Sequence, residues 1–179
     1  MEKSFTAYDN ALTFSHAFRT LFKIHMEARQ GAAVTEYKKK QQYRDFTLAV
    51  PALVNGSFAC ELFLKALLQN EGVDLKELKG RDGHTLNSLF EKLRNKNSEL
   101  AVNILTITAH CLSVKGHTYN EDALMKDLDT ISNLFTEMRY FYEGKTGEKA
   151  YHIDFLEAFM AALESMCEVL FGQRPELDT

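Results

Sequence analysis

A long apolar segment near the middle of the chain carries one acid and one base. Residues 55–68 are apolar at most positions, and Glu61 and Lys65 interrupt them. Positions four apart lie on the same face of an α-helix, one turn from each other. A helix that is apolar on nearly all sides is buried, and a buried charge is costly unless it is paired and hydrogen-bonded. The sequence therefore predicts a central buried helix, with further polar residues converging on Glu61 and Lys65.

Length and composition predict one domain. The chain has 179 residues, of which 45% are hydrophobic, which is enough for one core and rather short for two. It has no apolar run of about 18 residues and no basic start leading into an apolar segment. We therefore expect a cytoplasmic protein without a membrane span or a secretory signal. Cys60, Cys111 and Cys167 lie among apolar neighbours without metal-ligand spacing, which predicts buried free thiols and neither a metal site nor a cofactor.

The charge balance gives no overall attraction for nucleic acid. The formal net charge is −4, so only a local basic patch could attract phosphates. Lys38, Lys39 and Lys40, with Arg44 nearby, form such a cluster. A solvated linker is the preferred interpretation of this cluster, and contact with nucleic acid is the alternative.

The pattern of apolar residues predicts an all-α protein. Two prolines and nine glycines accompany long stretches of 3.6-residue periodicity. Pro51 marks either the first turn of the central helix or a kink within it. Asn120, followed by two acids, is a favourable helix start. The helices that we expect cover approximately residues 5–29, 44–70, 86–93, 98–111, 120–143 and 151–171, with residues 71–83 as the longest loop.

Three motifs, in this order and spacing, resemble the HEPN superfamily. They are the Ala-Cys-Glu-Leu-Phe-Leu-Lys-Ala-Leu-Leu helix at 59–68, Gly83-His84-Thr85-Leu86 before a short helix, and Arg139-Tyr140-Phe141-Tyr142-Glu143. The resemblance covers roughly residues 45–170 and implies an up-and-down helical bundle with a four-helix core and extra short helices. It also implies a homodimer of the kind found in prokaryotic toxin-antitoxin and phage-defence systems and in RNA-processing factors. Many such proteins are metal-independent ribonucleases, and others only bind.

The arginine-histidine motif that the resemblance implies for the cleaving members is not met at the expected place. In that motif about four to six residues separate an arginine from a histidine on a late helix, but twelve residues separate Arg139 from His152. Arg19 and His25 have five residues between them, yet they lie on the first helix, outside the region of resemblance. His25 continues the apolar stripe of that helix, which predicts a hydrogen-bonded core histidine. We therefore expect binding in preference to cleavage.

The polar residues of the motifs have two interpretations. In the functional one they share a pocket, in which Arg139 binds a phosphate, His84 exchanges a proton and Glu61 orients one of them. Arg139, with Tyr140 and Tyr142 as aromatic neighbours, would then suit stacking on bases as well as phosphate contact.

In the structural interpretation, Glu61 and Lys65 form a buried pair that fixes helix register. His84 would cap the short helix, and Arg139 would pair with Glu143 one turn later. The structural interpretation is favoured for Glu61 and Lys65, whereas the choice stays open for Arg139 and His84.

The predicted function is that of a HEPN-like dimer which binds RNA, a nucleotide or a partner protein in a prokaryotic defence or toxin-antitoxin setting. The partner protein would be a cognate antitoxin or a nucleotidyltransferase-like protein. A metal-independent endoribonuclease that uses Arg139 in a variant site is one alternative. A purely structural dimeric partner protein is the other.

Overall fold

The structure, a computed structural model, describes residues 2–31, 38–80, 83–132 and 153–172, without the side chains of residues 2–3, 28–31 and 38–47. It confirms the all-α class. Within these ranges the helices are α1 (Glu2–Gly31), α2 (Lys38–Asn70), the short 3-10 helix η1 (Leu75–Leu78), α3 (Leu86–Lys96), α4 (Ser98–Val114), α5 (Glu121–Ser132) and α7 (Ile153–Phe171).

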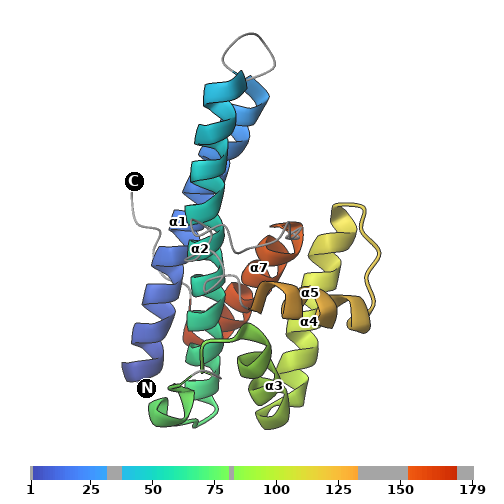
Figure 1. The fold of residues 1–179 in the computed structure, drawn as a ribbon. Coiled ribbons are helices and arrows are strands. Elements are labelled where there is room, and N and C mark those ends of the chain that lie inside the picture. The colour runs from blue at the N-terminus through green and yellow to red at the C-terminus, as the bar shows by residue number, and fades with distance from the viewer. Residues whose placement is uncertain (1, 32–37, 81–82, 133–152, 173–179) are drawn as a thin grey trace.

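The two longest helices, α1 and α2, form an antiparallel hairpin to which the other helices add on one side. Figure 1 shows α3, α4, α5 and α7 grouped beside the lower part of this hairpin. Helix α2 packs against α1, α3 and α7, and α7 also packs against α4. The other end of the hairpin stands clear of α3, α4, α5 and α7 (Figure 1).

Helix α2 is the central buried helix that the apolar segment predicts. Cys60, Phe63, Leu64 and Leu67 are fully buried in the main apolar cluster. Gly56 brings the neighbouring helices close, since a Cβ there would lie 2.8 Å from the ring of Phe18 on α1 and 3.1 Å from Leu156 on α7. The core is therefore built around the segment that carries Glu61 and Lys65.

The observed start of α2 differs from the expected one. The helix begins at Lys38, not near Arg44, and it continues through Pro51. Pro51 therefore does not mark a first turn, and Lys38, Lys39 and Lys40 are helical, so their interpretation as a linker is wrong. Helix α2 packs along α1, and tertiary packing of this kind can offset the hydrogen bond that Pro51 cannot donate.

Part of α2 also has the length and composition of a membrane span. The stretch Leu48–Asn70 has a mean hydropathy of 1.3, and half of its best window is buried inside the structure. The core helix of a globular protein has the same character, so this stretch alone is weak evidence for a span.

Apart from the end of α5, the remaining helix ends lie within three residues of those expected from the sequence. The side chain of Asn120 accepts a hydrogen bond from the Ala123 N–H at 2.9 Å, as expected for the residue that begins α5. The loop after α2 is held by Val73 and Leu78, which are both buried, and by a capping box of Asp74 and Glu77 around η1. The continuation expected for α5 beyond Ser132, up to residue 143, lies outside the described residues.

The cysteines are free, but not all are buried. Cys60 and Cys167 are fully buried, whereas Cys111 on α4 is half-buried, so the prediction of three buried thiols is wrong for Cys111. Its neighbours are apolar in sequence, but a helical position at the edge of the core keeps part of the residue in solvent. Burial raises the pKa of the Cys60 and Cys167 thiols.

We expect one fast thiol when the folded protein reacts with Ellman's reagent. The thiolate is the reactive form, and Cys60 and Cys167 combine burial with a raised pKa. Cys111→Ser should remove the fast phase, and denaturant should release the two slow thiols. A fast phase that persists in Cys111→Ser would contradict the buried placement of the other two.

Candidate functional site

The structure brings together three of the predicted site residues: Glu61, Lys65 and His84. The Oε1 atom of Glu61 lies 2.6 Å from Nζ of Lys65 and 3.0 Å from Nδ1 of His84. The Glu61 side chain is 4% exposed and that of Lys65 is 13% exposed, whereas 61% of the His84 side chain is in solvent. A buried carboxylate thus holds one partly buried base and one histidine at the surface.

A tight turn positions His84 over Glu61. Gly83 precedes His84, and its N–H donates to the Gly80 carbonyl at 3.1 Å. A Cβ at Gly83 would lie 2.1 Å from the carbonyl oxygen of Leu78, so only glycine fits against this backbone. Leu78 is itself buried in the core. The turn is therefore fixed on the side of the core, and it leaves His84 at the start of α3.

The start of α3 is capped from another helix and not by His84. Thr85 is the N-cap residue, but its side chain makes no capping bond. Instead, the Asn87 N–H donates to the Ser132 hydroxyl at 2.6 Å, and the Asn87 side chain donates to Asp129 at 3.2 Å. The predicted capping role of His84 is wrong because its Nδ1 is engaged by Glu61.

The geometry determines what His84 can do chemically. A carboxylate only accepts hydrogen bonds, so we assign the Nδ1 proton to the bond with Glu61. In the neutral ring, Nε2 is then the acceptor. Glu61 and Lys65 carry opposite charges, so a protonated His84 gives the cluster one net positive charge at its exposed edge. The cluster can accept or donate a proton at Nε2 and can donate to an anion.

Both interpretations of Glu61 and Lys65 find support in these distances. The pair is i,i+4 on α2, with Glu61 buried and Lys65 partly buried, which meets the structural interpretation for the carboxylate and in part for the lysine. The functional interpretation required Glu61 to orient a site residue, and it does orient His84. Four predicted site residues, Arg139, Tyr140, Tyr142 and Glu143, lie outside the described residues.

The arginine-histidine pair on α1 does not form a site among the described residues. Arg19 forms an ion pair with Glu164 of α7, with Nη2 and Oε2 2.5 Å apart, and Ser15 donates to the same oxygen at 3.1 Å. His25 is 6% exposed, and its ring lies against Phe22. It is buried as predicted, but its Nδ1 has no hydrogen-bond partner. The two residues therefore serve different contacts of α1.

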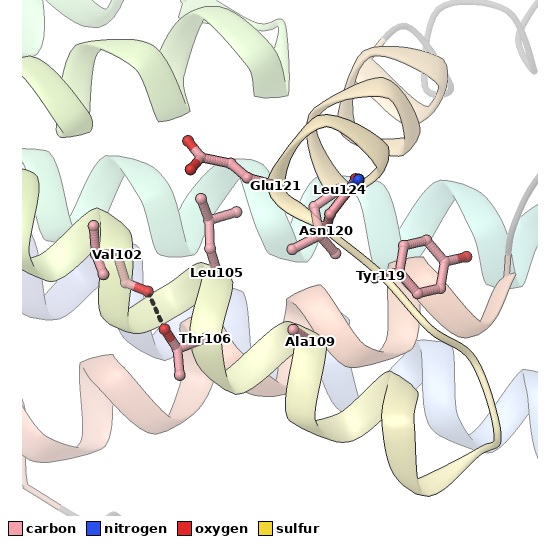
Figure 2. Close-up of a pocket in the computed structure, with 8 residues that line it drawn as sticks. All are labelled: Val102, Leu105, Thr106, Ala109, Tyr119, Asn120, Glu121 and Leu124. Carbon is pink, nitrogen blue, oxygen red and sulfur yellow. Dashed lines mark hydrogen bonds between the residues drawn. The ribbon is translucent and has the colours of Figure 1, made fainter.

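A small open pocket lies between α4 and α5, and neither Glu61 nor His84 lines it. Figure 2 shows its residues: Val102, Leu105, Thr106 and Ala109 on α4, and Tyr119, Asn120, Glu121 and Leu124 at the start of α5. Its volume is about 190 Å³, which is below the range of about 300–1,000 Å³ that is usual for ligand sites. Among the described ranges, no three His, Cys, Asp or Glu residues group as metal ligands would.

Sequence reasoning missed a second polar cluster, at the end of α4. Lys115 Nζ lies 2.7 Å from Asp154 and 2.5 Å from Glu157, and His117 Nε2 lies 3.5 Å from Asp154. Lys115 lowers the pKa of Asp154 by a charge-assisted hydrogen bond. These contacts join residues about 40 positions apart, and no local pattern signals such a pairing. The cluster holds the start of α7 against the α4–α5 connection.

Comparison with known proteins does not assign the chain to a family. No family model matches it, and neither a curated protein nor a solved structure matches it.

Proposed function

We propose that this chain is a HEPN-like helical protein that acts as a dimer and binds RNA at a surface site built on His84. The observation that carries the proposal is the bond between Glu61 and Nδ1 of His84, which holds an exposed imidazole in one orientation. An imidazole held in this way, with Nε2 facing solvent, suits contact with a phosphate when it carries its second proton. The resemblance in motif order supports a prokaryotic defence or toxin-antitoxin setting.

The position of α5 supports the participation of Arg139. Ser132 contacts Asn87, which lies three residues after His84, and Arg139 follows Ser132 by seven residues. Seven residues span at most about 25 Å, so the length of the chain after Ser132 allows Arg139 to take part in a site at the same end of α3. A guanidinium there would supply the bidentate phosphate contact that an imidazole lacks.

RNA binding is tested by fluorescence anisotropy in the presence of EDTA. We expect His84→Ala and Arg139→Ala each to raise the Kd for a labelled RNA about tenfold, because a hydrogen bond to a charged group contributes about 1.5–3 kcal/mol. His110→Ala is the matched control, since His110 is an exposed histidine on α4. Equal affinities for the His84→Ala, His110→Ala and unchanged proteins would exclude the site.

A metal-independent endoribonuclease is the second candidate function. It is favoured by the same Glu61–His84 bond, because a carboxylate that orients a histidine is a common arrangement in general acid–base catalysis. Electrophoresis of the RNA from the same mixtures distinguishes the two. Products that disappear in both His84→Ala and Arg139→Ala would establish cleavage. Intact RNA with measurable affinity would favour binding.

A purely structural dimeric partner is the third candidate, and the Glu61–Lys65 pair with its buried carboxylate is compatible with it. Such a protein would show no RNA affinity. The same result is expected if the ligand is only a nucleotide, or only a cognate antitoxin or a nucleotidyltransferase-like protein. Affinity that falls steeply with salt concentration would instead favour phosphate contact.

A further inference from the structure

The end of the α1–α2 hairpin has a charge opposite to that of the rest of the chain. Residues 23–44 contain six of the 21 Lys and Arg residues but two of the 25 Asp and Glu residues. This segment therefore has a net charge of +4 in a chain whose net charge is −4, so the other residues together carry −8. Such a separation of charge creates a local positive field that the net charge conceals.

The charges at the start of α2 are unfavourable for the helix itself. Lys38, Lys39 and Lys40 occupy its first turn, which contains no acid. A helix N-terminus carries a partial positive charge and is stabilised by acids, so three lysines there raise the positive potential. Helix stability therefore does not explain three lysines in this turn, whereas binding of an anionic partner would explain them.

The hairpin end is open to a large partner. Figure 1 shows it standing clear of α3, α4, α5 and α7. Glutamines and a tyrosine, Gln41, Gln42 and Tyr43, follow the lysines, with Arg44 after them. A membrane-binding helix needs a wide apolar face, and this polar sequence does not supply one. The composition matches that of elements which contact a nucleic-acid backbone.

We propose that this end of the hairpin, with Lys23, Arg29, Lys38, Lys39, Lys40 and Arg44, is a second RNA-contacting surface that binds phosphates without reading sequence. The proposal rests on the proposed RNA-binding function. Lys38 and Glu61 are 23 positions apart on α2, which corresponds to about 35 Å along the helix axis. A stacked RNA strand, which rises about 3.4 Å per nucleotide, needs about ten nucleotides to reach both surfaces.

The test compares a long RNA of about 20 nucleotides with a short one of about five, chosen on either side of that span. The variant is Lys39→Ala/Lys40→Ala, and the matched control is Lys96→Ala/Lys126→Ala, which removes two exposed lysines from α3 and α5. We expect the variant to weaken binding of the long RNA about tenfold at low salt. The slope of log K against log salt should fall in magnitude by about 1.4, because two phosphate contacts are lost at about 0.7 each for a single strand. The control should stay within about twofold of the unchanged protein.

A charge reversal separates binding from folding. Lys39→Glu/Lys40→Glu places acids in the first turn of α2, where they favour the helix. This variant should melt no lower than the unchanged protein and should bind the long RNA less well than the alanine variant. Loss of affinity without loss of stability would support the proposal. Equal affinity for the long RNA in all four proteins would overturn it.

The two RNAs distinguish failure of this proposal from failure of the His84 site. If His84→Ala lowers the affinity for both RNAs while the hairpin variants leave both affinities unchanged, the hairpin proposal is overturned and the His84 site stands. If the hairpin variants weaken the long RNA and His84→Ala has no effect, the hairpin surface stands alone. If the unchanged protein binds neither RNA, both RNA-binding proposals are overturned. The same holds if, in a parallel assay, the protein binds anionic vesicles and neither RNA.

Discussion

Glu61→Ala is expected to destabilise the protein by about 3 kcal/mol. Removal of one partner of a buried ion pair leaves the other charge uncompensated, at a cost of about 3–5 kcal/mol. Lys65 is 13% exposed and would lose its acceptor at 2.6 Å, and His84 would lose the acceptor that orients it. We take the lower end of the range because part of Lys65 reaches solvent. The measurement is the free energy of unfolding from urea denaturation.

Two further variants show whether the stability cost of Glu61→Ala comes from leaving Lys65 without its partner. Glu61→Leu/Lys65→Met replaces the pair by apolar residues of similar size and should recover stability to within about 1 kcal/mol of the unchanged protein. Glu121→Ala removes an exposed ion pair with Arg94, with the Glu121 side chain 56% exposed, and should cost at most about 1 kcal/mol. If Glu61→Ala costs no more than Glu121→Ala, the pair does not lie in a buried setting.

Patterning along the chain predicted the helices because each signal was local. The ends of α2, α3 and α7 at Asn70, Lys96 and Phe171 lie within a few residues of those expected, since glycines, prolines and periodicity mark them. The start of α2 was missed by six residues. The helix continues through Pro51 and packs against α1, and tertiary contact can override local propensity.

The site was predictable only in part. The buried environment of Glu61 follows from its apolar neighbours, and the need for converging polar groups follows from the cost of a buried charge. Which group converges depends on the turn at Gly83, which brings His84 from 23 positions away. The Ser132 hydroxyl that caps the start of α3 likewise comes from 45 positions beyond Asn87, from whose N–H it accepts a hydrogen bond. Such pairings depend on how the helices pack, which no local pattern encodes.

Gly83→Ala is expected to cost about 2–3 kcal/mol and to weaken RNA binding at His84. A Cβ at this position would lie 2.1 Å from the carbonyl oxygen of Leu78 and 2.6 Å from its carbonyl carbon. Backbone atoms cannot rotate away as a side chain can, so the turn itself must move. Overpacking of this kind costs about 1–3 kcal/mol, and Leu78 is anchored in the core. Urea denaturation and RNA anisotropy measure the two effects.

Gly80→Ala is the matched control in the same turn. Gly80 has a positive φ of 89°, but a Cβ there would meet no atom within 4 Å, so the variant should cost about 1 kcal/mol of backbone strain. Its RNA affinity should stay within about twofold of that of the unchanged protein, because the added Cβ does not displace His84 from Glu61. If Gly83→Ala binds RNA as well as Gly80→Ala does, the precise position of His84 over Glu61 is not needed for binding. If only Gly83→Ala loses affinity, the absence of a side chain at Gly83 is needed to hold the imidazole of His84 in its binding orientation.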